Sequence, residues 1–218
     1  VFEEERELTV MLLIDVSGSN LFGTKNEFKA DLITELAAVL SFSAINNNDK
    51  VGVIFFSNTV EKFIPPKKGR SHILRIISEL VNYEPTQSQT DIAEALRYMT
   101  NAIKKKCTAF LISDFVNSDF EQALKIAANK HDVVALHVMD QGEATLPDVG
   151  LIQLQDPETG KYCMIDTSDI KVRKTHATWW HEQRMRNKEL FQKVGVDVAD
   201  LYTNKDYVSS LTELFRRR

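Results

Sequence analysis

At 218 residues, with 43% hydrophobic residues, the chain is long enough to bury one large core without covalent cross-links. Its formal net charge of −4 argues against a general nucleic-acid-binding protein, which normally has a basic excess. No apolar run approaches the roughly 18–20 residues of a membrane span, and the acidic start EEERE is unlike a signal peptide, so we expect a cytoplasmic protein.

A strand buried on both faces is predicted for the apolar run LTVMLLI at 8–14, which stops at the polar loop DVSGSN. The elements expected next, in chain order, are a helix over 25–46, strands over 50–56 and 60–64, helices over 70–82 and 90–105, a strand over 108–113, a helix over 118–129 and a strand over 133–139. The short Ser57-Asn58 connection demands an antiparallel hairpin, and Pro65-Pro66 is expected to end its second strand. The remaining alternation predicts an α/β fold with a parallel sheet.

The alternation pauses late in the chain, where we expect an inserted β-hairpin at about 150–166. Its strands, 150–155 and 162–166, flank the turn sequence DPETG. A long, mostly polar helix over 168–194, a strand over 196–201 and a helix over 206–215 complete what we interpret as a single domain, 1–218. Cys107 and Cys163 stand in apolar, strand-like surroundings and are expected to be reduced thiols of the core.

Polar side chains follow the strands at one predicted edge of the sheet. They are Asp15, Ser17 and Ser19 after the first strand, Thr90 before a helix, and Asp114 after the strand 108–113. Because ligands bind at the carboxyl ends of parallel strands, we expect these side chains to meet. Two carboxylates and three hydroxyls are hard oxygen donors, which suit Mg²⁺, Mn²⁺ or Ca²⁺ rather than zinc.

Each of these residues also has a plainer interpretation. The Asp15 loop can be a turn that caps the next helix, and Thr90 can be an N-cap, which would still let it offer oxygen to a metal. Asp91 is interpreted as a first-turn charge favoured by the helix dipole rather than as a ligand. The five histidines show no zinc-ligand spacing.

The sequence DVSGS at Asp15–Ser19 resembles the D-x-S-x-S signature of the metal-ion-dependent adhesion site of von Willebrand factor A domains. Thr90 in QTDIAEAL and Asp114 in FLISDF match the second and third loops of that site. The resemblance implies that Asp15, Ser17, Ser19, Thr90 and Asp114 hold one metal ion, with Mg²⁺ as the first expectation and Mn²⁺ or Ca²⁺ as the others.

Over nearly its whole length the chain is similar to the bacterial domain-of-unknown-function family 58. The similar segments are FEEERELTVMLLIDVSGS, NDKVGVIFFSNTVEKFIPPKKG, TDIAEALRY, FLISDF, HDVVALHVMD and LPDVGLIQLQDPETG. The resemblance implies a Rossmann-like von Willebrand factor A fold, a mostly parallel six-stranded sheet in the order 3-2-1-4-5-6 with strand 3 antiparallel and helices on both faces. It also implies a short segment before Val1 and a genomic association with MoxR-type AAA+ ATPases. Phe115 stands where many such domains have Gly, and Asn20 where an apolar residue is commoner.

From these residues we expect a metal-ion-dependent protein-binding module, an adaptor rather than an enzyme. The cation would bind an Asp or Glu of a partner, and by resemblance it would work with a MoxR-type AAA+ ATPase. The alternative is a Mg-dependent phosphoryl-transfer or hydrolytic enzyme, because haloacid-dehalogenase-like phosphatases have their nucleophilic Asp at such a strand end. Those enzymes place a second Asp two residues on, where this chain has Ser17, and no phosphate-binding loop or Gly-x-Ser-x-Gly is present. A structural domain without a bound ligand is the third hypothesis.

Overall fold

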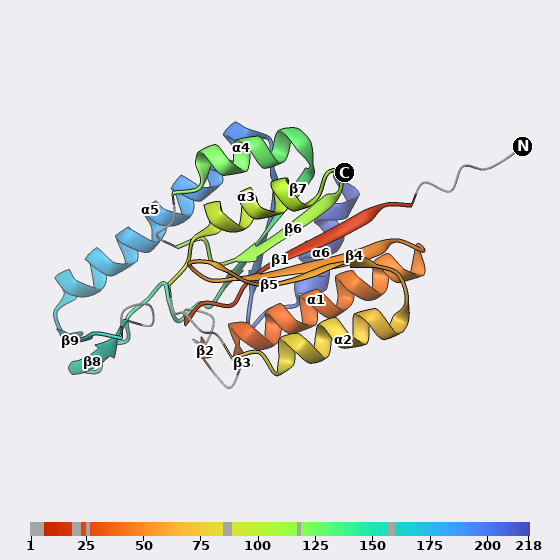
Figure 1. The fold of residues 1–218 in the computed structure, drawn as a ribbon. Coiled ribbons are helices and arrows are strands. Elements are labelled where there is room, and N and C mark those ends of the chain that lie inside the picture. Colours follow the sequence, from red (N-terminus) through yellow and green to blue (C-terminus); the bar gives the residue numbers. More distant parts are fainter. Residues whose placement is uncertain (1–6, 19–22, 25–26, 85–88, 117–118, 157–159) are drawn as a thin grey trace, which may run out of the picture.

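A six-stranded sheet forms the centre of the protein (Figure 1). The computed structural model describes residues 7–18, 23–24, 27–84, 89–116, 119–156 and 160–218. In this part of the chain the sheet has the order β10-β7-β6-β1-β4-β5. Its strands are β1 (Thr9–Asp15), β4 (Lys50–Phe56), β5 (Val60–Lys67), β6 (Thr108–Ser113), β7 (Asp132–Met139) and β10 (Asp197–Tyr202). Neighbouring strands are parallel except β4 and β5, which confirms the predicted order 3-2-1-4-5-6 with an antiparallel third strand.

Helices cover both faces of this sheet. One face packs against α1 (Lys29–Asn46), α2 (Arg70–Val81) and α6 (Tyr207–Arg216), and the other against α3 (Ile92–Ala102), α4 (Glu121–Lys130) and α5 (Ile170–Val194). Two small antiparallel sheets accompany it, β2 (Gly23–Thr24) with β3 (Glu27–Phe28), and β8 (Leu151–Gln155) with β9 (Tyr162–Asp166). The helix predicted over 25–46 begins only at Lys29 because residues 27–28 pair with 23–24 instead.

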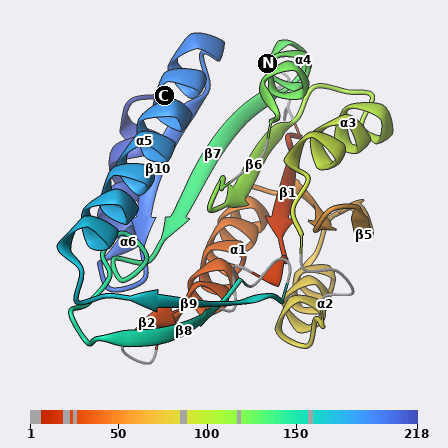
Figure 2. The ribbon, with the colours of Figure 1, turned by 90° about the vertical axis from the view of Figure 1, so that its left-hand side faces the viewer.

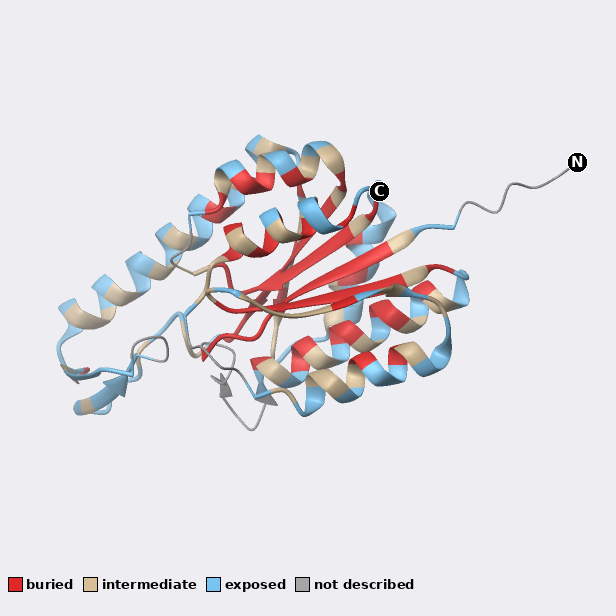
Figure 3. Ribbon diagram, viewed as in Figure 1, coloured by how far each residue is buried: buried red, intermediate tan, exposed pale blue. Residues whose placement is uncertain are grey.

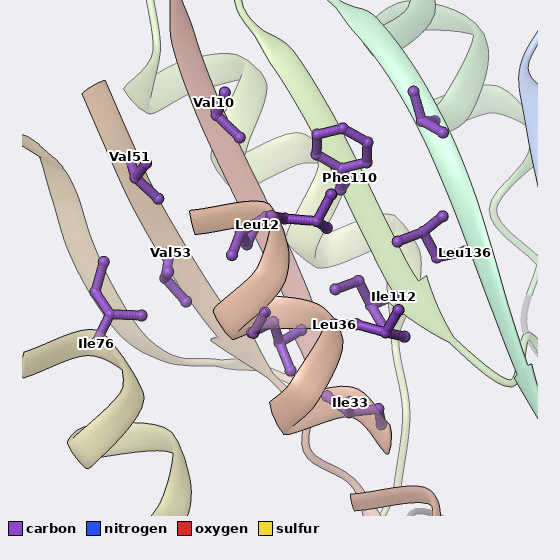
Figure 4. Packing of buried hydrophobic residues seen from close by; sticks show 14 of the residues in the cluster. Val10, Leu12, Ile33, Leu36, Val51, Val53, Ile76, Phe110, Ile112 and Leu136 are labelled. Atoms are coloured by element: carbon purple, nitrogen blue, oxygen red, sulfur yellow. The ribbon is translucent and has the colours of Figure 1, made fainter. Parts of the chain in front are cut away.

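Strand β1 explains why two helical layers form. Successive side chains of a strand point to opposite faces, and here Leu12 and Ile14 enter the cluster with α1 and α2, whereas Met11 and Leu13 enter the cluster with α3 and α4. All four are fully buried. Figure 4 shows the first cluster, which includes Leu12 of β1 and Leu36 of α1. A strand covered on both faces is apolar throughout, which is why this run is unbroken.

Strand β5 does not stop at the two prolines as predicted but continues through Pro65 and Pro66 to Lys67. Proline lacks a backbone donor and is tolerated at a sheet edge or a bulge, and β5 is an edge strand with a register shift between Val51 and Val53 of its partner. Gly52 lies at this shift. A Cβ there would come within 2.9 Å of the Pro66 nitrogen, so the irregular pairing needs a residue without a side chain.

The late hairpin lies where it was predicted, and it projects from the sheet together with the first half of α5 (Figure 1). Figure 2 shows β8 and β9 crossing the end of the molecule at which β1 finishes. Both elements are almost entirely exposed, in contrast to the buried sheet (Figure 3). Cys163 of β9 is exposed, so its placement in the core was wrong, whereas Cys107 is buried and both thiols are free. Among the described residues, no helix combines the length and apolar composition needed to cross a membrane.

Candidate metal centre

Asp15 and Asp114 stand at the carboxyl ends of neighbouring parallel strands. Asp15 is the last residue of β1, and Asp114 directly follows Ser113, the last residue of β6. Ile14 and Ile112 are partners in the register, so both strands end at the same edge. The Ser113 hydroxyl donates a hydrogen bond of 2.6 Å to Asp15 Oδ2. The sheet therefore brings these two predicted ligands together at the edge where α/β proteins bind ligands.

The Asp15 carboxylate is 1% exposed and is held by the turn that follows it. Its Oδ1 accepts a hydrogen bond of 3.0 Å from the Ser17 amide, and Ser17 is also buried. Burial, and after it the charge of Asp114, raises the pKa of Asp15 to about 6, although hydrogen bonds from Ser113 and Ser17 oppose this shift. Two buried carboxylates in this relation are stabilised by a cation. Ser19, the next predicted ligand, lies outside the described residues.

The segment that contains Thr90 is held at the end of β4, the other neighbour of β1. The Asp91 amide donates a hydrogen bond of 2.8 Å to the carbonyl of Ser57. Ser57 follows Phe56, which is the register partner of Asp15. The three predicted loops thus lie at the same edge, at the ends of the neighbouring strands β4, β1 and β6.

The helix cap in this segment differs from the prediction. Asp91 is the N-cap of α3, because it has an extended backbone and its Oδ1 accepts a hydrogen bond of 2.9 Å from the Glu94 amide. The interpretations of Thr90 as the cap and of Asp91 as a first-turn charge were therefore wrong. The Thr90 hydroxyl is left for another role: its Oγ1 is buried and has no hydrogen-bond partner among the described residues.

A buried lysine that the sequence analysis missed contacts Asp114. Lys29, the first residue of α1, is 0% exposed, and its Nζ lies 2.9 Å from Asp114 Oδ2 and 2.6 Å from Glu143 Oε1. Burial lowers the pKa of Lys29, but the two carboxylates more than offset this and raise it above its ordinary value. Neither the helical spacing nor a motif distinguishes Lys29 or Glu143 from solvated charges, so no sequence signal was available for them.

Phe115, where the resemblance led us to expect Gly, has a left-handed backbone conformation. Its φ is +53°, in the left-handed region that costs a non-glycine residue about 1 kcal/mol or more. The strain is held by packing, because the ring is 1% exposed and lies 5.1 Å from the ring of Phe191 and 5.5 Å from that of His137. The Asn187 side chain also donates a hydrogen bond of 3.0 Å to its carbonyl. Asp114 is thus followed by a rigid turn.

A pocket of about 270 Å³ opens beside Asp114, between the ends of β6 and β7 and helix α5. Its lining includes His137, Glu143, Trp180 and Arg184. One His137 ring nitrogen lies 3.0 Å from the carbonyl oxygen of Asp114 and the other 3.1 Å from Asp200 Oδ1, so the imidazole is fixed at both ends. Of the candidate ligands in the described part of the chain, Asp114 alone lines this pocket, so the pocket lies beside the candidate centre, between Asp114 and α5.

The donor set fits a hard divalent cation. Among the described residues, no group of three or more His, Cys, Asp or Glu side chains is placed to hold a metal ion. The candidate centre has a different composition: the two carboxylates, the buried Ser17 and the unsatisfied hydroxyl of Thr90. Oxygen donors of this kind suit Mg²⁺, Mn²⁺ or Ca²⁺.

The fold, with its antiparallel edge strand and polar loops at the carboxyl ends of β1, β4 and β6, is that of a von Willebrand factor A-like protein. The chain belongs to the family described as "Protein of unknown function DUF58", whose model matches residues 1–186. It is similar to a protein of Mycobacterium tuberculosis named "Uncharacterized protein Rv1480", with 27% identity over 98% of this chain and 68% of the relative.

Solved structures share the fold. The aerotolerance-related membrane protein of Bacteroides fragilis matches with a TM-score of 0.63 and 18% identity, over 96% of this chain and 97% of that one. The protein BatB of Bacteroides thetaiotaomicron matches with a TM-score of 0.59 and 16% identity, over the same shares of the two chains. At these identities the likeness concerns the fold alone.

Proposed function

We propose that this protein is a metal-dependent protein-binding module, in which a divalent cation at the candidate metal centre binds a carboxylate of a partner. Asp15, Ser17, Ser19, Thr90 and Asp114 would hold the cation, with Mg²⁺ as the first candidate. Bound there, it would supply a Lewis acid for an Asp or Glu side chain. The observation that carries the proposal is the buried Thr90 Oγ1, unpartnered among the described residues, in a segment anchored at the strand edge where the two aspartates meet.

The charge of the donor set favours an external acidic ligand. Two carboxylates offset the charge of a divalent cation, and the hydroxyl donors add none, so the complex does not repel an anion. A centre with three or four unbalanced acidic ligands would hold the cation more tightly and attract a further carboxylate less. The set of two carboxylates and neutral hydroxyls therefore suits an adaptor that binds an acidic side chain of a partner.

The composition of α5, which contacts the turn after Asp114 through Asn187, also favours an acidic partner, although Arg173, Arg184 and Lys193 are paired with Asp148, Asp200 and Glu121. Helix α5 has seven basic and two acidic side chains in a chain whose net charge is −4. These residues are Lys171, Arg173, Lys174, Arg184, Arg186, Lys188 and Lys193, and Glu182 and Glu189. Much of this helix and the hairpin is exposed, including Trp179 and Tyr162, and aromatic side chains are common at protein interfaces. By the family resemblance, we propose that the partner is, or is remodelled by, a MoxR-type AAA+ ATPase.

The proposal includes no catalytic step. A phosphatase of the kind considered above needs a general acid two residues after its nucleophilic aspartate, and that position is Ser17. His137, the histidine nearest to Asp114, has both ring nitrogens engaged by Asp200 and the Asp114 carbonyl. It is therefore poorly placed to act as an acid or base for a substrate at Asp15.

Calorimetric titration of Mg²⁺ and Mn²⁺ into EDTA-treated protein tests the cation. We expect one site in the wild type and none in Asp15→Asn, which keeps the shape of the side chain and removes its charge. The partner is tested by affinity capture with and without EDTA, using the same variant as the control. Cation binding without any EDTA-sensitive capture would contradict the adaptor role, and turnover of phosphatase or esterase substrates that Asp114→Ala abolishes would replace it with an enzyme.

A further inference from the structure

Two further charged side chains, Lys29 and Glu143, lie beside Asp114 and are not candidate ligands. Lys29 holds Asp114 Oδ2 with one of its hydrogen bonds and Glu143 Oε1 with another. Its side chain is fully buried, and that of Glu143 is 10% exposed. A buried lysine beside a cation site is unexpected, because its charge repels the cation and weakens the hold of Asp114 on it.

The position of Glu143 is fixed by its own contacts. Its Oε2 accepts a hydrogen bond of 3.1 Å from the Asp140 amide, and its carbonyl oxygen lies 2.7 Å from His176 Nε2 of α5. The turn after β7 and helix α5 therefore hold Glu143 against Lys29 from one side. Asp114 reaches the lysine from the other side, at the end of β6.

We propose that Lys29 and Glu143 set the charge of the metal centre: Lys29 occupies one oxygen of Asp114 and weakens cation binding, and Glu143 neutralises most of that effect. This inference rests on the proposed function, since it concerns the affinity of the same centre. With Asp15, Asp114, Glu143 and Lys29 counted together, the four side chains leave two negative charges for a divalent cation. The cation then keeps its attraction for the carboxylate of a partner.

The proposal predicts opposite effects for two substitutions that each remove one charge with little change of side-chain size. Lys29→Met keeps an unbranched side chain, one atom shorter, but leaves three negative charges, so this variant should bind Mn²⁺ about tenfold more tightly or better. Glu143→Gln leaves one negative charge and should bind Mn²⁺ about tenfold more weakly. The double variant Lys29→Met/Glu143→Gln restores the count of two, and its affinity should return to within about threefold of the wild type.

A purely structural role for Lys29 and Glu143 predicts a different order of Mn²⁺ affinities among the variants. If Lys29 and Glu143 served only to hold the loops in place, every variant would bind Mn²⁺ more weakly than the wild type, and the double variant would not recover. The decisive comparison is thus the sign of the Lys29→Met effect and the recovery in the double variant. If Lys29→Met alone fails to fold, the comparison of Glu143→Gln with the double variant still distinguishes the two roles, because only the charge-setting role predicts that the double variant binds Mn²⁺ more tightly.

The measurement is calorimetric titration of Mn²⁺ into the four EDTA-treated proteins at one pH and ionic strength, with circular dichroism to verify folding. The expected order of affinity is Lys29→Met above wild type and double variant, with Glu143→Gln below them. A wild type that binds Mn²⁺ while the variants bind equally or uniformly more weakly would overturn this inference and leave the proposed function standing. A wild type that binds no divalent cation would overturn the proposed function and this inference with it.

Discussion

The Ser113 hydroxyl and the Asp15 carboxylate, 98 positions apart in the sequence, are joined by a hydrogen bond of 2.6 Å at the end of the central sheet. Ser113 Oγ also accepts a hydrogen bond of 3.1 Å from the Phe115 amide. One hydroxyl therefore connects the first predicted metal loop to the backbone of the third. The geometry of the centre depends on this connection as much as on the ligands.

Replacing Ser113 with Ala should lower the free energy of unfolding by about 2 kcal/mol, because a buried carboxylate loses a hydrogen bond that favours its charged form. Ser41→Ala is the matched control, since Ser41 Oγ is buried without a hydrogen-bond partner among the described residues. We expect that control to be neutral or slightly stabilising. Urea unfolding at pH 7.5 in EDTA compares the two, and equal effects would contradict the role of the Ser113–Asp15 bond.

Thr90→Val should act in opposite directions on stability and on cation affinity. Removal of a buried, unsatisfied hydroxyl should leave the metal-free protein equally stable or more stable by about 1 kcal/mol. The affinity for Mn²⁺ should fall, by at least the roughly tenfold typical of lost support to a metal site. Thr100→Val is the control, because Thr100 lies near the far end of α3, the helix that follows Thr90, and its hydroxyl donates to the Leu96 carbonyl.

Calorimetry and urea unfolding of both threonine variants provide the test. Unchanged Mn²⁺ affinity in Thr90→Val, with the wild type binding normally, would remove Thr90 from the ligand set. A loss of affinity in Thr100→Val of the same size would show that the effect is not local.

Gly52→Ala should destabilise the sheet by about 1–3 kcal/mol without changing the cation site. The new Cβ would lie 2.7 Å from Met11 Sδ, which can move, but also 2.9 Å from the Pro66 nitrogen and 3.0 Å from the Ile64 carbonyl oxygen, which cannot move without shifting β5. Thermal unfolding measures the effect. A melting temperature equal to that of the wild type would contradict the bulged pairing of β4 and β5.

Acidification should destabilise the protein through His131. This ring is 2% exposed, and burial, followed by the charge of Lys130, lowers its pKa from the ordinary value near 6.5. The unfolded chain therefore binds the proton more readily, so stability is lost as the pH falls from about 6.5 towards the lowered pKa. His131→Gln removes this titration, and its unfolding free energy in EDTA should change less between pH 7.5 and 5.5 than that of the wild type. A parallel pH dependence of the two proteins would exclude His131 as a contributor.

The parts of the fold that could be predicted are those set by hydrophobic periodicity. The unbroken apolar runs of β1, β6 and β7 mark strands covered on both faces, and the short Ser57-Asn58 turn requires the antiparallel pairing of β4 with β5. Element ends were less predictable where local signals conflict with tertiary contacts. Pro65 and Pro66 normally end a strand, but an edge position with a register shift accommodates them.

In the candidate centre, the residues that could be predicted are those that belong to the D-x-S-x-S motif and to its two companion loops. Asp15 and Asp114 could be placed at neighbouring strand ends because the parallel topology determines where those ends lie. The partners that set the local electrostatics could not, because Lys29, Glu143 and Ser113 carry no distinctive spacing and meet only through the tertiary fold. The left-handed backbone of Phe115 could not be predicted from the phenylalanine itself, because a bulky residue is rare in that conformation and is retained here by its ring contacts. The glycine that the family resemblance places at this position was the one hint of it.

The most direct test of the metal centre is a crystal structure of the protein soaked in Mn²⁺, with anomalous scattering recorded to locate the ion. We expect an anomalous peak bounded by Asp15, Ser17, Thr90 and Asp114, with an oxygen ligand from outside these side chains in one coordination position. Well-ordered density for these residues with no anomalous peak among them at millimolar Mn²⁺ would contradict it.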